Sequence, residues 1–446
     1  MTGAAAKRTL ARTLGSRDLT LIVIGTVIGS GIFIVPGAVL RQSGGHAGVA
    51  LLVWLVGGVL SLLGALAYGE LGAMEPAAGG LYVYMRDTFG PLPAFLYGWT
   101  LFFAISSGSL ATLAVAGAGY LGQIVALTPF MRKLAAVALV AIVAAVNVRG
   151  TRHGATVQGW ATAIKVAAIV VMAAVLIGAG HGLRSADVTA FPAHVDAPLL
   201  SGIGLSMISV LWAYEGWQYV TFSAGEARDP QWTFPRGIVL GTTALIVVYL
   251  VANVSYLAAL GPQAAGGTDT VAADAVRAVA GPAAGELIAA AIVVAIFGAA
   301  NGLTLTAPRV YFAMARDKLF FRRLAEVHPR FGTPAMAVVV SSVWAALLAL
   351  SGTFEQLLTY VVFTGWIFYG LGALSLFVYR RRQPDRPRPF RVPGYPWAPA
   401  LFVLAAAAIV LNTLIARPVQ ALLGLGIVLL GAPAYSVWKW RAARAI

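Results

Sequence analysis

"GTVIGSGIF", residues 25–33, places three glycines and a serine inside an apolar run that otherwise has the length of a membrane-spanning helix. Glycine is among the poorest residues for a helix interior. In the hydrocarbon core of a bilayer, no water satisfies the backbone groups that a broken helix leaves free. The stretch is therefore either a close packing surface between helices or a break whose backbone groups bind something other than water.

The composition is that of an integral membrane protein. Hydrophobic residues make up 59% of the 446 residues, and charged residues only 11%. A soluble chain of this size could not cover its surface with so few charges. The alternating strands of a membrane barrel are not seen in the sequence, so helices are the expected spanning elements.

Apolar runs of about 20 residues predict an all-α bundle of twelve transmembrane helices. The predicted spans are residues 18–40, 48–72, 89–124, 133–149, 156–180, 199–224, 236–260, 284–315, 334–351, 355–379, 397–416 and 418–438. An even number of spans places both termini on the same side of the membrane.

The distribution of positive charge predicts which side that is. Most of the 31 Lys and Arg residues fall in the tails, residues 1–17 and 439–446, and in the loops on the side of those tails. Lys and Arg collect in cytoplasmic loops, so both termini are predicted to be cytoplasmic, in a multi-pass protein of the plasma or inner membrane. Membrane orientation thus explains the net charge of +15 without nucleic-acid binding.

Two spans carry interruptions, and these lie five spans apart. The first contains "GTVIGSG" and the sixth contains "AYEGWQ". Weakened spans at corresponding positions of two halves indicate an inverted-repeat transporter, in which broken helices present backbone groups at the bilayer midplane. The predicted halves are residues 18–180 and 199–379, with two helices appended over residues 397–438.

Several chemistries have no motif in the sequence. A phosphate-binding G-x-x-x-x-G-K-[ST] loop and an H-E-x-x-H metal motif are both absent. The chain has no cysteine, which excludes disulfides and thiolate metal sites. We therefore expect no enzyme activity, no metal and no cofactor, and energy from solute or ion gradients.

The first break has the features of an anion site. If the chain unwinds at Gly29, Ser30 and Gly31, free N–H groups and the positive end of the following half-helix face a cavity, and such a cluster binds a carboxylate. Helix packing through the pair Gly25 and Gly29 is the alternative.

The second break, "WAYEGWQ", residues 212–218, complements the first. Unwound carbonyls at about Ala213 to Glu215, with those of Val27 and Ile28, are placed to accept hydrogen bonds from an ammonium group. The two breaks together describe a site for an α-amino acid zwitterion. Trp212 is interpreted as a lid over the substrate side chain, with core packing or lipid contact as the alternative.

Two charges lie inside spans, Lys165 in the fifth and Glu215 in the sixth. A membrane-embedded charge costs about 3 kcal/mol on insertion scales, so each needs a partner or a function. Lys165 either snorkels to the interface or holds the carbonyls of the first broken helix where a sodium ion would otherwise lie. It is also a candidate proton carrier. For Glu215 the sequence leaves three roles open: it faces the cavity and favours cationic substrates, it bonds to neighbouring backbone, or it pairs with Lys165.

Four motifs resemble the amino acid–polyamine–organocation superfamily, most closely bacterial relatives of the L-type amino acid transporters. They are "GTVIGSGIFIVPG", "AIKVAAI", "LWAYEGWQ" and "PRVYFAMARDKLFF". The resemblance implies a LeuT-like five-plus-five inverted repeat with discontinuous helices 1 and 6.

Carried over by position, the resemblance assigns Gly29, Ser30 and Gly31 to the substrate carboxylate, and Val27 and Ile28 to the amino group. Trp212 matches an aromatic gate, and Lys165 matches the lysine that replaces a sodium site. Glu215 departs from the small or apolar residue common at its position. Animal relatives join a heavy chain through a disulfide, which a chain without cysteine cannot form.

The expected function is a sodium-independent secondary transporter of L-amino acids, neutral ones favoured, working by alternating access. Exchange and proton-coupled symport both remain open. A cationic amino acid or polyamine permease is the alternative within this class. An ion channel or inorganic-ion transporter on the same architecture is the alternative from another class, although the spans lack the charged rings of a channel.

Overall fold

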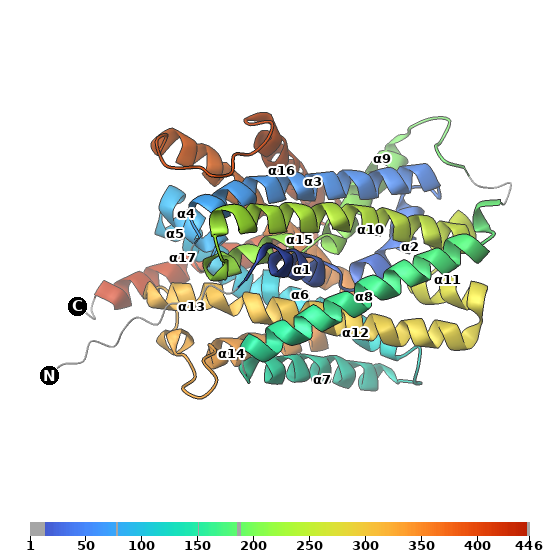
Figure 1. Cartoon of the computed structure of the whole chain (residues 1–446), viewed down its shortest axis with the longest axis horizontal. Coiled ribbons are helices and arrows are strands. Elements are labelled where there is room, and N and C mark those ends of the chain that lie inside the picture. Colours follow the sequence, from blue (N-terminus) through green and yellow to red (C-terminus); the bar gives the residue numbers. More distant parts are fainter. Residues whose placement is uncertain (1–13, 77–78, 150, 185–188, 444–446) are drawn as a thin grey trace.

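The computed structural model describes residues 14–76, 79–149, 151–184 and 189–443, and these form helices throughout (Figure 1). The described residues contain no strand, only an isolated parallel bridge between Leu14 and Ala227. The α-helices are α1 (Ser16–Val27), α2 (Gly31–Gln42), α3 (Ala47–Met74), α4 (Leu81–Phe89), α5 (Pro91–Thr100), α6 (Ser106–Leu121), α7 (Pro129–Val148), α8 (Thr151–Ala179), α9 (Ala197–Ala213), α10 (Pro230–Gly266), α11 (Val271–Ala280), α12 (Pro282–Thr306), α13 (Pro308–Arg316), α14 (Ala335–Ser351), α15 (Phe354–Arg382), α16 (Trp397–Ala416) and α17 (Pro418–Ala443). One π-helical segment, η1 (Leu101–Ile105), and three 3₁₀ segments, η2 (Gly182–Arg184), η3 (Trp217–Glu226) and η4 (Arg322–Ala325), complete them.

Helix starts follow ordinary capping chemistry. The side chain of Asp196 accepts a hydrogen bond from the Leu199 amide at the start of α9. Thr128 does the same for Met131 at the start of α7. Such caps satisfy amide groups that have no partner within the helix.

The all-helical prediction is confirmed, and the spans are longer and more segmented than the sequence indicates. Ten helices or helix runs in the described residues are long and apolar enough to cross a membrane, and the bent pair α1–α2 adds an eleventh. α14 has 17 residues and falls among the shorter apolar helices. The count of twelve therefore stays a prediction. Two short helices, α4 and α11, were not predicted.

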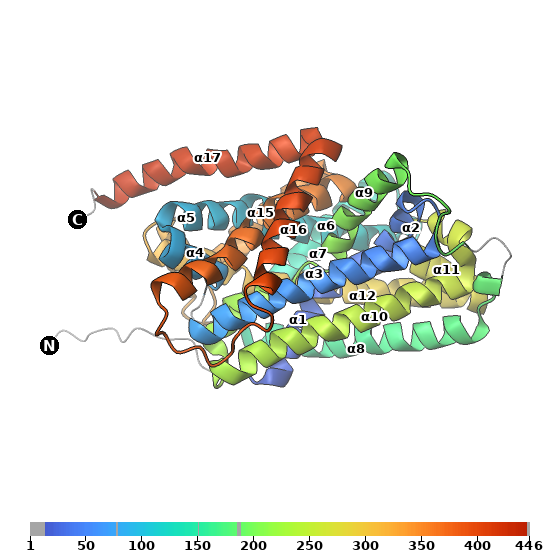
Figure 2. The same ribbon diagram turned by 90° about the horizontal axis from the view of Figure 1, so that it is seen from above.

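The broken first helix lies inside the bundle. α1 contacts α8, α10 and α12, and it is surrounded by them in Figure 1. α16 and α17 pack on the outside, against α3, α5 and α15 (Figure 2). A central broken helix places its free backbone groups away from lipid, where a buried cavity can reach them.

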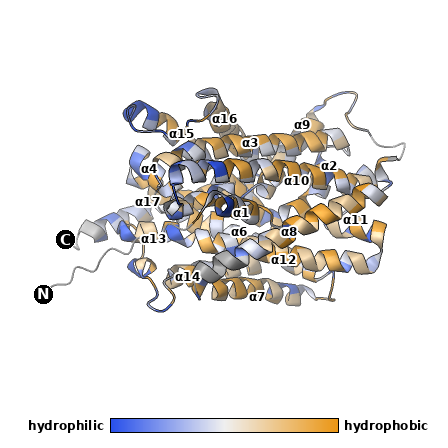
Figure 3. Ribbon diagram, viewed as in Figure 1, coloured by the Kyte–Doolittle hydropathy of each residue, from blue (hydrophilic) through white to orange (hydrophobic). Residues whose placement is uncertain are grey.

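The outer helices consist largely of hydrophobic residues (Figure 3). Exposed examples include Phe130 on α7, Trp160 on α8 and Leu287 on α12, each at least 70% exposed. An apolar surface of this extent requires a lipid solvent. The chain is therefore a multi-pass membrane protein.

One end of the bundle is rich in arginine. It holds α4, α13, the C-terminal end of α17 and the loop 383–396 (Figures 1 and 2). The opposite end holds α11 and the C-terminal end of α2. We call these the arginine-rich end and the opposite end.

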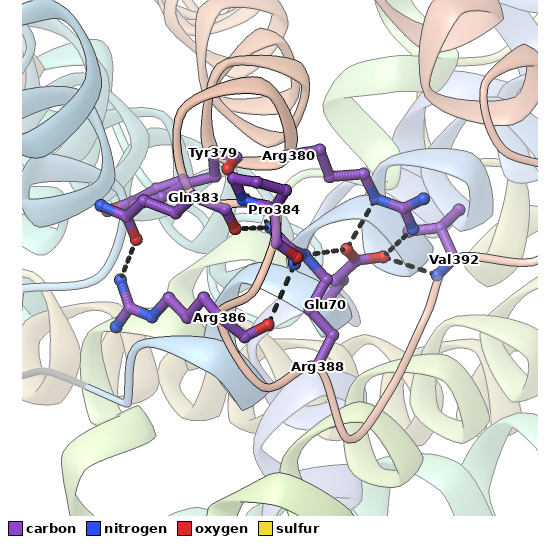
Figure 4. A network of polar contacts seen from close by, with 8 residues as sticks. All are labelled: Glu70, Tyr379, Arg380, Gln383, Pro384, Arg386, Arg388 and Val392. Atoms are coloured by element: carbon purple, nitrogen blue, oxygen red, sulfur yellow. Dashed lines mark hydrogen bonds and ion pairs between the residues drawn. The ribbon is translucent and has the colours of Figure 1, made fainter.

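The end of α15 and the basic loop after it are bound to α3 by hydrogen bonds and ion pairs (Figure 4). Glu70 is completely buried and accepts two hydrogen bonds from Arg380, at 2.9 and 2.6 Å. The Val392 amide donates to the same carboxylate at 2.7 Å, and Arg388 lies 3.6 Å from it. Bidentate, charge-assisted pairs of this kind fix geometry as well as charge. The arginine run thus has a structural role beyond membrane orientation.

Candidate functional site

The first predicted break is present in the structure. α1 ends at Val27, α2 begins at Gly31, and the two helices meet at 50°. Ile28 has extended dihedral angles, and Ser30 caps α2 without using its side chain. The Ser30 hydroxyl is buried and has no hydrogen-bond partner among the described residues. The amino end of α2 therefore combines a helix dipole with an unused hydroxyl.

Lys165 holds this break from α8. Its ammonium donates to the carbonyl oxygens of Gly25 at 2.7 Å and Ile28 at 2.8 Å, and more weakly to Ala295 at 3.4 Å. The side chain is 1% exposed, so it does not snorkel to the interface. A cation placed on the carbonyl end of α1 satisfies the groups that the break leaves without helical partners.

The glycines of the break also pack helices closely. A Cβ added at Gly31 would lie 2.4 Å from the Cα of Ala213 on α9. One added at Gly29 would lie 2.9 Å from the side chain of Leu113. From the sequence, helix packing and ligand binding are alternatives. In the structure, Gly29 and Gly31 pack closely against neighbouring helices and also line a small cavity between the two breaks. In this conformation Ala213 therefore packs against Gly31, and it is not among the residues that line the cavity between the two breaks.

The second predicted break is also present. α9 ends at Ala213, a turn follows, and η3 begins at Trp217. Gly216 has φ of 127°, a conformation that favours glycine, and its carbonyl accepts a hydrogen bond from the Thr26 hydroxyl at 3.2 Å. The two breaks are therefore in direct contact across 190 residues of chain.

Tyr249 on α10 connects the same two breaks. Its hydroxyl lies 3.1 Å from the carbonyl of Val27 and 2.9 Å from that of Ala213. These carbonyls are predicted to bind a substrate ammonium, and in the structure each has a protein neighbour, as does Ile28 through Lys165. Each carbonyl oxygen keeps a second lone pair. Tyr249 is not predictable as part of the site, since a tyrosine in an apolar span gives no distinguishing signal in the sequence.

Glu215 is buried beside the second break and is held by side chains rather than by Lys165. Its Oε1 accepts hydrogen bonds from Gln218 at 2.6 Å, Tyr219 at 3.1 Å and Tyr369 at 2.5 Å. The described residues donate no hydrogen bond to Oε2. Because the neighbours of Lys165 are carbonyls, the two charges do not form the ion pair that the sequence left open.

A cavity of about 20 Å³ lies where the two breaks meet. It has room for one water molecule but not for an amino acid, so the site is closed down in this conformation. Six of the eight predicted substrate-binding residues line it; Ile28 and Ala213 do not. The lining residues are Thr26, Val27, Gly29, Ser30, Gly31, Ser109, Leu113, Trp212, Glu215, Tyr219, Ala299 and Leu303.

A larger cavity of about 530 Å³ occupies the opposite end, bounded there by residues such as Arg41 and Thr270. Phe354 lines this cavity, and Trp212 lines the smaller one. Their ring centroids are 6.4 Å apart in an edge-on arrangement. The aromatic pair lies between the two cavities.

The arginine-rich end is closed by polar contacts. Arg309 on α13 pairs with Glu226 on η3 at 2.6 Å, and both side chains are largely buried. Arg86 on α4 pairs with Asp317 at 2.8 Å, and Tyr82 donates to the same carboxylate. The site therefore lies between the larger cavity, which we call the vestibule, and the ion-paired helices of the arginine-rich end.

Two broken helices in contact at the centre of an apolar bundle, with a vestibule on one side, define a membrane transporter of the discontinuous-helix class. Comparison with known proteins agrees. The family described as "Amino acid permease" matches residues 14–427.

Individual relatives match over nearly the whole chain. The serine/threonine exchanger SteT of Bacillus subtilis is 31% identical over 440 residues, covering 97% of this chain and 98% of that protein. The human large neutral amino acids transporter small subunit 2 is 32% identical, covering 96% and 80% respectively. The human b(0,+)-type amino acid transporter 1 is 31% identical, covering 92% and 84%. The chain belongs to the amino acid permease family of the amino acid–polyamine–organocation superfamily, and it is a transporter rather than an enzyme.

Proposed function

We propose that this protein moves L-amino acids across the plasma or inner membrane, independently of sodium, by alternating access. The substrate carboxylate binds the amino end of α2 at Gly29, Ser30 and Gly31. Its ammonium group binds the remaining lone pairs of carbonyls at the ends of α1 and α9. The relatives named above are transporters or exchangers of amino acids, which supports this substrate class.

One observation carries the proposal: the Ser30 hydroxyl is buried, has no protein partner among the described residues and lines the cavity at the start of α2. A buried hydroxyl without a partner costs about 1–3 kcal/mol. Beside the positive end of a helix, an anionic ligand removes that cost and gains the dipole interaction. A carboxylate is the group that this corner of the cavity fits.

Sodium independence is inferred from Lys165. Its ammonium already occupies the carbonyls of Gly25 and Ile28, which would otherwise be free to hold a cation. A sodium ion at the same carbonyls would be repelled by the ammonium and would find its ligands taken.

Alternating access is inferred from the two ends of the site. The vestibule reaches the pair Trp212 and Phe354, while the pair Arg309 and Glu226 closes the other end. In the proposed cycle the ion pairs at the arginine-rich end separate as the vestibule collapses. We propose that one group of helices rocks against another. Both groups are drawn from the two repeats, residues 18–180 and 199–379, of a five-plus-five fold with twelve spans.

Neutral amino acids are the proposed main substrates, because Oε1 of Glu215 is already filled by three protein donors. Cationic substrates are the second candidate. Glu215 lines the cavity, and the described residues leave Oε2 without a donor.

The proposed orientation places both termini and the arginine-rich end in the cytoplasm, because Lys and Arg are retained on that side. With no cysteine in the chain, no heavy chain can be linked to it by a disulfide. Exchange and proton symport are the two proposed modes of energy coupling.

Uptake of labelled amino acids into proteoliposomes tests the proposal. We expect equal uptake in sodium and in choline buffers, and competition by amino acids that have free carboxyl and amino groups. Strong dependence on sodium would refute the assignment of Lys165. Vesicles preloaded with amino acid separate the coupling modes: uptake into empty vesicles driven by a pH gradient excludes obligate exchange.

A further inference from the structure

A cationic pocket lies at the arginine-rich end, away from the transport site. It has a volume of about 250 Å³ and is formed by the chain after α13 and by the end of α17. Its lining consists of three cations and three aromatic residues, without an acid: Lys318, Arg322, Arg441, Phe320, Phe321 and Trp438. We call it the cationic pocket.

In the described part of the chain, the three cations of this pocket differ from other arginines at this end in having no carboxylate partner. Arg86, Arg309 and Arg380 each form an ion pair with a carboxylate. Among the described residues, none forms an ion pair or side-chain hydrogen bond with Lys318, Arg322 or Arg441. Three neighbouring positive charges repel one another and create a local potential that attracts an anion.

The aromatic residues give the pocket a fixed floor. Phe320 stacks on Trp438 with ring centroids 5.7 Å apart, and Phe321 meets the same ring edge-on at 5.0 Å. These contacts join two segments more than 100 residues apart in sequence. Phe321 is nevertheless 52% exposed, so part of the floor remains available to an apolar ligand.

The position of the pocket along α17 places it at the membrane surface. Leu429, Leu430 and Val437 present exposed apolar side chains toward lipid. The apolar stretch of the helix is followed by aromatic and basic residues at positions 438–441, which read Trp-Lys-Trp-Arg. Tryptophan with lysine or arginine at the end of an apolar span marks the level of the lipid headgroups.

We propose that the cationic pocket binds the phosphate of an anionic phospholipid, such as phosphatidylglycerol. Lys318, Arg322 and Arg441 contact the phosphate and its negative charge. The acyl chains lie along the exposed apolar face of α17. Basic pockets between membrane helices are suited to such headgroups. The bound lipid joins the segment that follows α13 to the appended helix α17.

Native mass spectrometry of the purified transporter, titrated with phosphatidylglycerol or phosphatidylcholine of the same acyl chains, tests the proposal. The test variant is R322Q/R441Q. The matched control is R323Q/K439Q, which removes two exposed charges from adjacent positions that do not line the pocket.

We expect wild type and R323Q/K439Q to retain one more phosphatidylglycerol than R322Q/R441Q, and all three to retain phosphatidylcholine equally. Loss of two charge-assisted contacts should weaken this binding by at least about tenfold. Equal retention of phosphatidylglycerol by all three proteins would overturn the proposal.

Two further arms keep the result decisive. R322K/R441K preserves charge and should retain the lipid even if R322Q/R441Q proves poorly folded; its failure to do so while monodisperse also counts against the proposal. Inorganic phosphate and glycerol phosphate at millimolar concentration identify the source of the anion. If they displace phosphatidylglycerol completely, the pocket takes a soluble phosphate and the lipid assignment is wrong.

Discussion

The two helix breaks both leave backbone groups without helical partners, but the ionisable side chains beside them have opposite charges. The first break carries a built-in cation, because Lys165 lies on the carbonyl end of α1. The second carries an acid, Glu215, held by three side-chain donors on one oxygen. At the first break the hydrogen-bond donors of α2 remain for a ligand, and at the second a carboxylate oxygen remains.

This difference teaches that a broken membrane helix need not be stabilised by its substrate. Protein side chains donate to carbonyls of both breaks, since Lys165 bonds to Gly25 and Ile28, and Thr26 bonds to Gly216. On the donor side of the first break, the buried Ser30 hydroxyl has no partner among the described residues. The proposed substrate contact is therefore most specific at its carboxylate.

Lys165→Ala should have the largest effect. It leaves the carbonyls of Gly25 and Ile28 without their donor, at a cost of about 1–3 kcal/mol for each buried group. We expect uptake in proteoliposomes to fall by at least about tenfold, or to lose its coupling. Lys133→Ala, which removes an exposed lysine on α7, is the control. Normal coupled uptake by Lys165→Ala would show that the first break needs no cation.

Glu215→Gln tests the acid of the second break. Glutamine keeps an acceptor for the tyrosines but removes the charge, so we expect uptake of cationic amino acids to fall by about tenfold or more. That loss corresponds to one charge contact, worth roughly 1.5–3 kcal/mol. Uptake of neutral amino acids should change less than about threefold, because a neutral side chain makes no charge contact with Glu215. The exposed Glu286→Gln serves as control. If the ratio of cationic to neutral uptake does not move, Glu215 is structural.

Ser30→Ala tests the donor side of the first break. It removes one buried hydroxyl and fills no space, so the protein should remain monodisperse. We expect the KM for amino acids to rise by about three- to tenfold, as for one hydrogen bond of roughly 0.5–1.5 kcal/mol. Ser206→Ala removes another buried hydroxyl without a partner among the described residues, one that does not line the cavity. Equal KM values for the two variants would remove Ser30 from the site.

Trp212→Phe should have the smallest effect. Phenylalanine preserves an aromatic contact with Phe354, and edge-on aromatic pairs contribute about 0.5–1.5 kcal/mol beyond the apolar area that they bury. We expect substrate affinity to weaken by about two- to threefold, measured by thermal-shift titration, with faster release in counterflow. A variant in which counterflow stops altogether would contradict a simple lid.

A large part of this site could be predicted from the sequence because membranes make certain residues conspicuous. Glycines and charges inside apolar spans are costly in lipid, so "GTVIGSGIF", Lys165 and Glu215 are recognisable from hydropathy alone. Tyr249, Tyr369 and Gln218 are not, because a polar side chain that bonds within the bundle has no signature in the local pattern. The closeness of Gly31 to Ala213 likewise depends on how two distant helices pack.

The sequence by itself determined that this is a helical membrane protein of the amino acid permease family, with breaks in its first and sixth predicted spans. Those conclusions follow from hydropathy, helix propensity and motif, which are local properties of the chain. Only the tertiary structure decided that the breaks touch, that Lys165 bonds to α1 and not to Glu215, and that a water-sized cavity lies between them. Helix packing decides which polar groups far apart in the chain come into contact, and no local sequence pattern encodes that packing.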